Sequence, residues 1–155
     1  MTMPVQDTSA LSRIQPVISA AGAKAVLRAA EAKATEIGVP VVVVVVDDGG
    51  DLKALLGMDG PPKGAIQWSI DKAITAASFR TPTHVLAQAM EGVGWAIPSL
   101  MAQPHATLAP GGFPLVIDGA VVGAVGASGG TPDQDQVVAT TGWLPSGDRP
   151  SRAGP

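Results

Sequence analysis

An unbroken run of β-branched residues limits the folds open to this chain. Residues 39–46 read VPVVVVVV and show no alternation of apolar and polar side chains. A run this short and this uniformly apolar is typical of a strand that is covered on both faces. Its eight residues are also far fewer than the roughly twenty that a membrane-spanning helix needs. We therefore expect a central strand in a covered sheet, and no association with a membrane.

The segments around this run predict hairpins rather than repeated parallel crossovers. Turn residues at 47–51 and the dipeptide Asp118-Gly119 each separate two short apolar segments, as in antiparallel hairpins. The order of elements therefore predicts an α+β domain with a mainly antiparallel sheet of about five strands. The expected strands are 39–46, 52–58, 105–109, 113–117 and 120–126, and the expected helices are 20–37, 64–79, 83–90 and one that begins after Thr131.

The composition fits a single domain that associates with itself. The 155 residues are 46% hydrophobic but only 15% charged, against about 25% charged in an average soluble domain. A surface short of charge is most simply covered by another copy of the chain, so we expect a homodimer or a higher oligomer. The domain is expected over residues 13–144, between an N-terminal tail at 1–12 and a C-terminal tail at 145–155.

Charge and residue counts exclude two classes of function. Ten basic against 13 acidic residues, with two Phe, three Trp and no Tyr, leave little to neutralise phosphates or stack on bases, so we expect no nucleic-acid binding. The lack of cysteine removes disulfides and thiolate metal sites, and no other metal site is expected. The first dozen residues lack the basic and apolar segments of a signal peptide, and we expect a cytoplasmic protein.

The helix expected at 64–79 has two opposed apolar faces. By helical spacing, one face holds Ile66, Ile70, Ala73 and Ala77, the opposite face holds Trp68, Lys72, Thr75 and Phe79, and a narrow polar stripe between them holds Gln67, Asp71 and Ser78. A helix with two apolar faces has to be covered on both sides. We expect the first face to lie on the sheet, and the second to meet a partner subunit or a ligand.

Three separated stretches carry a resemblance to a known family. They read VVVVDDGGDLKALLGMDG, SIDKAITAASFRTPTHVL and APGGFPLVIDGAVVGAVGASGGTPDQDQ. Over roughly residues 13–142 the chain resembles the GlcG/HbpS-type haem-binding family, whose domain also forms the C-terminal part of some PduO-type cobalamin adenosyltransferases. The resemblance implies a profilin-like α/β sandwich with a five-stranded antiparallel sheet, assembly into dimers or larger oligomers, and haem or a related tetrapyrrole as a possible cofactor.

Two cations are candidates for holding an anionic ligand. Lys72 lies between Trp68 and Phe79 on the outward face, and it matches a lysine that the family commonly carries there. A lysine among apolar neighbours holds a carboxylate, has a lowered pKa, or extends its charged end to water at a subunit seam. Arg80, at the helix end, either clamps an anionic substituent or interacts with the helix C-terminus. We expect Trp68 and Phe79 to form the apolar wall of the same pocket.

Glycine-rich turns are the candidate backbone donors of that pocket. Ser128, Gly129 and Gly130 lead into the N-terminus of a helix, where free N–H groups and the helix dipole favour an anion. The alternative is a purely structural turn, since Thr131 already caps this helix. Gly111 and Gly112 either let a ligand approach the backbone or make a tight connection.

A haem site and acid–base chemistry would both use a histidine, and the chain has two. His84 is expected at an exposed helix end, and His105 at a strand edge or in a pocket. A haem iron accepts one histidine or a weaker oxygen ligand, and no histidine here has a spacing that assigns the ligand. The N-terminal histidine ligand of some relatives has no counterpart before Val39. His105 and Glu91 fall in or near a segment that departs from the family pattern, and they are the candidate catalytic residues.

These features favour an oligomeric protein that binds a small anionic and planar molecule, such as haem, near a subunit interface. The alternative is a cofactor-independent isomerase, lyase or hydrolase that acts on a small organic acid or an aromatic-derived metabolite. In that case His105 or Glu91 moves the proton, while Lys72 and Arg80 hold the acid group. A third possibility is an accessory subunit with a vestigial pocket.

Overall fold

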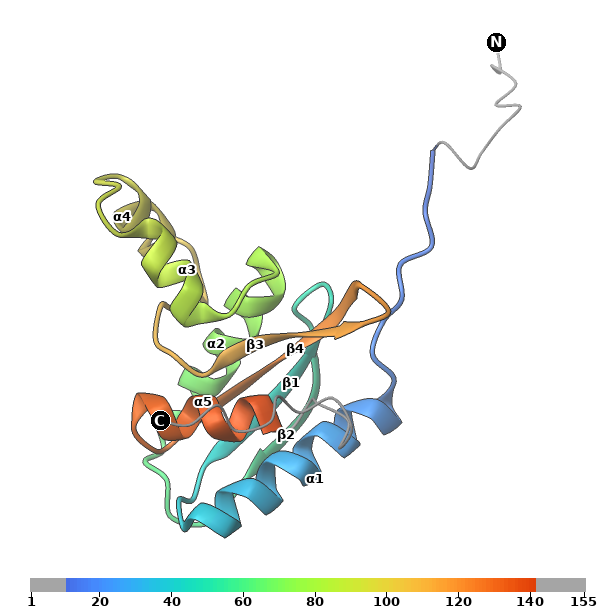
Figure 1. Cartoon of the computed structure of the whole chain (residues 1–155), viewed down its shortest axis with the longest axis vertical. Coiled ribbons are helices and arrows are strands. Elements are labelled where there is room, and N and C mark those ends of the chain that lie inside the picture. The colour runs from blue at the N-terminus through green and yellow to red at the C-terminus, as the bar shows by residue number, and fades with distance from the viewer. Residues whose placement is uncertain (1–10, 142–155) are drawn as a thin grey trace, which may run out of the picture.

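The computed structural model of the chain describes residues 11–141. Within them, a four-stranded antiparallel sheet carries helices on both faces (Figure 1). Apart from residues 11 and 12, the tails expected at 1–12 and 145–155 lie outside the described residues, as do 142–144 of the expected domain. The elements in chain order are α1 (Ala20–Ile37), β1 (Val42–Asp47), β2 (Leu52–Gly57), α2 (Ala65–Phe79), α3 (Thr83–Met90), α4 (Ala96–Met101), β3 (Gly112–Ile117), β4 (Ala120–Ser128) and α5 (Pro132–Thr141).

The valine run forms an inner strand of the sheet, as predicted. The strand order is β2-β1-β4-β3, so β1 pairs with β2 on one side and with β4 on the other. Val43 and Val45 belong to a core that includes α1 and α5, whereas Val42, Val44 and Val46 belong to a core beneath α2. Both faces of β1 are therefore buried, which explains why the run shows no alternation.

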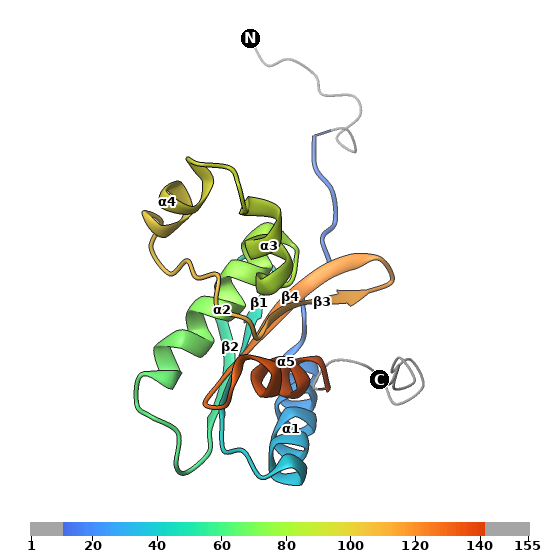
Figure 2. The ribbon, with the colours of Figure 1, turned by 60° about the vertical axis from the view of Figure 1, so that its left-hand side comes forward.

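The helices divide between the two faces of the sheet. Figure 2 shows α1 and α5 on one face and α2 on the other, with α3 and α4 extending beyond the end of α2. Helix α1 begins after Ser19, whose Oγ accepts a hydrogen bond from the Gly22 N–H at 3.0 Å, and it ends at Gly38 in the left-handed conformation. No helix within residues 11–141 is long and apolar enough to cross a bilayer.

Helix α2 lies on the sheet through its small residues, and this contact face overlaps only in part with the face that the pattern indicated. Ala73 and Ala77 of the predicted face are buried in the core beneath α2, and Ile70 packs against that core. A Cβ added at Gly126 of β4 would lie only 2.1 Å from the Ser69 carbonyl oxygen, so the two backbones are nearly in contact. This close approach buries Ser69, Ala73 and neighbouring small side chains, and it leaves Ile66 exposed. The predicted division of α2 into two apolar faces is therefore wrong for Ile66, which is exposed, and for Lys72 and Thr75, which are buried within the domain.

The expectation of five strands is also wrong, because residues 105–109 do not form a strand. The main-chain N–H of Thr107 donates to the Thr75 hydroxyl at 3.0 Å, and the N–H of Ala109 donates to the Thr107 hydroxyl at 3.1 Å. Threonine side chains thus take hydrogen bonds that a strand would give to a neighbouring strand. Before this segment lies α4, which was not predicted. Its Pro98 falls in the first turn, where a missing N–H is tolerated.

Candidate ligand-binding site

A mostly apolar pocket lies between the second half of α2 and the α3–α4 region. Its volume is about 480 Å³, within the range of roughly 300–1,000 Å³ that is usual for small-molecule sites. Helix α4 and the irregular segment after it form one wall, and α2 forms the other. The lining residues are Ile74, Thr75, Ser78, Phe79, Met90, Trp95, Ala96, Ser99, Leu100, Gln103, Pro104, His105 and Ala106.

His105 is the imidazole of this pocket, and a carboxylate orients its ring. The Nδ1 atom lies 3.2 Å from Oδ1 of Asp71, a half-buried residue of α2. The amide of Gln67 donates to the same Asp71 oxygen at 2.7 Å, and its nitrogen also lies 3.3 Å from Nδ1 of His105. When Nδ1–H donates to Asp71, Nε2 keeps its lone pair for a ligand, a metal or a proton.

The backbone of His105 is held in an uncommon conformation. Its φ is 60°, in the left-handed region that few residues other than glycine adopt. The buried Thr75 hydroxyl donates to the His105 carbonyl oxygen at 3.4 Å and accepts the Thr107 N–H, so both sides of the turn are tied to α2. Such conformations persist where the surroundings impose them, and they gather at functional sites.

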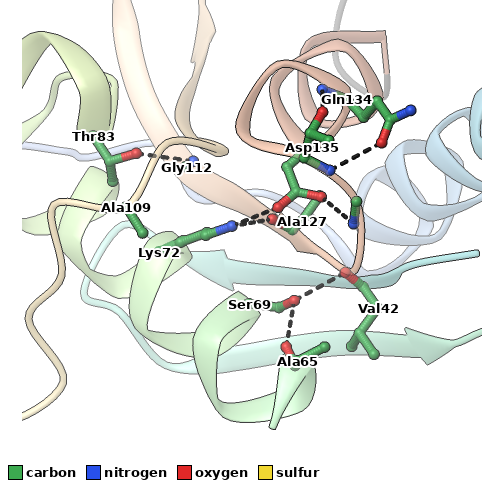
Figure 3. Close-up of polar contacts among 12 residues, drawn as sticks. Val42, Ala65, Ser69, Lys72, Thr83, Ala109, Gly112, Ala127, Gln134 and Asp135 are labelled. Carbon is green, nitrogen blue, oxygen red and sulfur yellow. Dashed lines mark hydrogen bonds and ion pairs between the residues drawn. The ribbon is translucent and has the colours of Figure 1, made fainter. Parts of the chain in front are cut away.

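Lys72 lies away from this pocket, in a buried ion pair (Figure 3). Its Nζ donates to Oδ2 of Asp135 at 2.9 Å and to the Ala127 carbonyl oxygen at 2.8 Å, while Oδ1 of Asp135 accepts from the Gly130 N–H at 2.9 Å. Burial lowers the pKa of Lys72 and raises that of Asp135, and the contact between them opposes both shifts.

The expectation that Lys72 supplies charge between Trp68 and Phe79 is wrong. Lys72 is 2% exposed, whereas Trp68 is 60% exposed and Phe79 is 44% exposed. The lysine turns away from both aromatic residues because its partner, 63 residues later in the chain, lies at the start of α5. No local pattern in the sequence predicts the ion pair between Lys72 and Asp135.

Gly111 and Gly112 make room for this lysine. A Cβ at Gly112 would lie 2.4 Å from the Lys72 carbonyl oxygen, and one at Gly111 would lie 3.2 Å from the Lys72 Nζ. The Gly112 N–H donates to the buried Thr83 hydroxyl at 3.1 Å (Figure 3). The structure therefore assigns the two glycines to close packing around Lys72, the tight connection considered above, and neither lines the pocket of His105.

The other predicted turn residues line a different hollow. Ser128, Gly129 and Gly130 meet Trp68 around a space of about 310 Å³, together with Pro62, Gly64, Ala65 and Asp135. Trp68 and Phe79 are eleven residues apart on α2, which places them about 16 Å apart along the helix. The single predicted wall thus divides between two hollows, with Trp68 at one and Phe79 at the other.

Three further candidates stand outside the lining of both hollows. Arg80 ends α2 with a φ of 52° and is exposed, directly after Phe79. Glu91 is exposed at the end of α3, directly after the lining residue Met90. The ring of His84 contacts that of Phe113, with their centroids 5.6 Å apart, so His84 is half-buried rather than exposed.

The sequence reasoning missed the partner of His105. Asp71 and Gln67 were assigned to a polar stripe on α2 without a role, although their spacing of four residues places them side by side on a helix. This polar stripe was the sequence feature from which a role for Asp71 and Gln67 could have been predicted. Its connection to His105 depends on the irregular segment at 102–111, which the sequence did not predict.

Comparisons with known proteins agree with this fold. The family model described as "Haem degrading protein HbpS-like" matches residues 18–143. The chain is 41% identical over 125 residues to the uncharacterized 15.0 kDa protein in the dhaT-dhaS intergenic region of Citrobacter freundii, covering 80% of this chain and 88% of that protein. It is 37% identical over 112 residues to Protein GlcG of Escherichia coli K12, covering 72% of this chain and 81% of GlcG.

One solved structure of a similar protein contains a bound ligand. The crystal structure of the PduOC:haem complex superposes with a TM-score of 0.74 at 30% identity, covering 81% of this chain and 92% of that one. The shared α+β fold and the match over most of the sequence agree with the motifs quoted above. The chain belongs to the HbpS-like family.

Proposed function

We propose that this protein binds haem in the pocket of His105. The observation that carries the proposal is an imidazole at an apolar pocket whose Nδ1 lies 3.2 Å from the Asp71 carboxylate. With the proton on Nδ1, Nε2 is the nitrogen that would bind iron. Membership of the HbpS-like family and the haem complex of the PduOC relative support it.

The residues that line the pocket of His105 are suited to bind haem. Phe79, Trp95 and Leu100 offer the apolar wall that a macrocycle needs, and His105 offers the axial nitrogen. Asp71 would increase the basicity of that nitrogen, and Arg80 stands next to the wall as a cation for a propionate. When bound, haem supplies a redox-active iron, while the chain binds it, orients it and keeps water from one face.

A second copy of the chain is the proposed cover of the open side of this pocket. Trp95 is 73% exposed although it lines the pocket, and Ile97 and Met101 of α4 are exposed beside it. Contiguous apolar surface of this kind marks contact sites in soluble proteins. We infer a homo-oligomer in which α4 of one copy helps to close the site.

Titration with haemin tests the proposal. We expect a saturable Soret band for the wild type, and a shifted band with at least tenfold weaker binding for His105→Ala. His84→Ala is the matched control, because His84 lies outside the pocket lining, and we expect its titration to follow the wild type. A wild type without a saturable band, or a His105→Ala protein that titrates like the wild type, would contradict the proposal.

Acid–base catalysis is the second candidate, because an imidazole held by a carboxylate is also the arrangement of a general base. Glu91 does not line the pocket, so His105 alone would move the proton. The test is deuterium incorporation into small organic acids in D₂O, followed by NMR. Exchange that His105→Ala abolishes while assembly is unchanged would favour the enzyme, and exchange that this substitution leaves unaltered would dismiss it.

A further inference from the structure

We propose a second ligand site, specific for a small organic carboxylate, in the hollow where Ser128 faces Trp68 between the N-termini of α2 and α5. This hollow shares no lining residue with the pocket of His105. The inference is therefore independent of haem binding.

The hydroxyl of Ser128 is the first sign of a ligand. Ser128 is opposite Val42 in the sheet, and Val42 belongs to the core beneath α2, so the serine side chain lies on that face as well. The residue is buried, and its Oγ has no hydrogen-bond partner among residues 11–141. A buried hydroxyl without a partner is costly and uncommon, and a ligand atom in the adjoining hollow would satisfy it.

The two helix ends make the hollow favourable for an anion. Helix α2 begins at Ala65, after Gly64, with no side-chain cap and with no acidic residue in its first turn, and Lys63 precedes Gly64. The positive end of its dipole thus faces the hollow without an acidic side chain beside it. The Ala65 and Ile66 N–H groups already donate to the Pro62 and Lys63 carbonyl oxygens, so α2 contributes its dipole more than free donors. At α5 the Gly130 and Thr131 N–H groups are already used by Asp135 and Gln134, so α5 contributes its dipole more than free donors.

Asp135 does not cancel this preference, because both its oxygens are engaged. Oδ2 accepts from Lys72 and Oδ1 accepts from Gly130, each at 2.9 Å. The ion pair with Lys72 carries no net charge. Asp133, in the first turn of α5, offsets the dipole of that helix, so the N-terminus of α2 with the preceding Lys63 is the positive end that favours an anion here.

The apolar wall of the hollow favours a ligand whose carboxylate is attached to a small, flat and apolar group. Trp68 exposes most of its side chain here and Pro62 lies in the same lining, so a flat apolar group can pack against them. The space of about 310 Å³ suits a molecule near the lower end of the usual range for small-molecule sites, from roughly 300 Å³. A carboxylate on a small aromatic or apolar body meets both conditions, with its oxygens toward Ser128.

Calorimetric titration with benzoate, beside its neutral analogue benzamide and inorganic phosphate, tests the site. We expect saturable binding of benzoate and at least tenfold weaker binding of benzamide and of phosphate. Ser128→Ala should raise the Kd of benzoate about tenfold or more, the scale of one lost hydrogen bond to a charged group. Ser99→Ala is the matched control, since Ser99 lines the other pocket.

Stability separates a ligand-binding serine from a structural one. Because the Ser128 hydroxyl has no partner in the described residues, Ser128→Ala should have a Tm equal to or above that of the wild type. Binding should survive His105→Ala, so failure of the haem proposal would not remove this site. The proposal is overturned if benzoate does not saturate, if benzamide binds equally well, or if Ser128→Ala leaves the Kd unchanged.

Discussion

Lys72 and Asp135 illustrate, at the scale of single residues, why a buried charge cannot be judged alone. Each has lost most of its water, and burial shifts both pKa values toward the neutral forms. The contact at 2.9 Å offsets this desolvation only while both partners are present. The pair thus ties α2 to α5, and each residue depends on the other.

Replacing one partner of this pair should cost far more than replacing both. Lys72→Met leaves a buried carboxylate without its cation, and we expect the free energy of unfolding to fall by about 3–5 kcal/mol. The double variant Lys72→Met/Asp135→Leu should recover most of that loss, because no charge is then buried. Urea unfolding of the wild type, both single variants and the double variant measures the coupling.

The exposed ion pair of α1 is the control for this measurement. Lys33 and Glu36 also lie 2.9 Å apart, but Glu36 is largely in solvent. Lys33→Met should change the free energy of unfolding by less than about 1 kcal/mol. Equal losses for Lys72→Met and Lys33→Met, or a double variant no more stable than its single parents, would show that the two buried charges are not coupled.

At the scale of elements, strands with strong local signals were predictable and the contact faces of α2 were not. The valine run, the turn at 47–51 and Asp118-Gly119 correctly predict two of the three strand pairs, β1–β2 and β3–β4, because each hairpin signal lies within a few residues. The orientation of α2 depends instead on Gly126, a residue of a distant strand. Hydrophobic periodicity placed Ala73 and Ala77 on the sheet correctly but added Ile66, whereas close backbone packing selected small side chains.

Gly126→Ala tests the close approach of α2 to β4. The added methyl group would lie 2.1 Å from the Ser69 carbonyl oxygen and 2.8 Å from the Ala73 backbone nitrogen, so the helix has to move. Overpacking of this kind costs about 1–3 kcal/mol, and we expect the free energy of unfolding to fall by at least that amount. Thermal and urea unfolding measure it.

Gly57→Ala is the matched substitution, on the edge strand β2. Its added Cβ has no neighbour within 4 Å among the described residues, and its φ needs no glycine. We expect Gly57→Ala to stay within about 0.5 kcal/mol of the wild type. A Gly126→Ala protein as stable as Gly57→Ala would contradict the packing described for α2.

At the scale of the whole molecule, the sequence anticipated the kind of site but not its assembly. Phe79 and His105 were both singled out, and the structure brings them to one pocket. Trp68 and Ser128 were assigned to that pocket as well, yet they meet at a separate hollow. The division follows from the length of α2, which the spacing predicted, and from the irregular path of residues 102–111, which it did not.

Self-association is the prediction that belongs to this scale. Exposed apolar residues on α4, with only 15% charged residues in the chain, leave a surface that a second copy would cover. Native mass spectrometry should give an integer multiple, two or more, of the 15.5 kDa chain mass. Met101→Glu should shift the distribution of masses toward the single chain. Lys24→Glu, at an exposed position of α1, should not. A wild type that stays monomeric at micromolar concentration would contradict the prediction.

The most direct test of the central claim is rescue of the proposed iron ligand by imidazole. His105→Gly suits this test because the φ of 60° at this position is one that glycine adopts without strain. We predict that His105→Gly loses the Soret band of the wild-type haem complex and that added imidazole restores it, while imidazole leaves the wild-type band unchanged. A haem spectrum of His105→Gly identical to that of the wild type before imidazole is added would contradict the account.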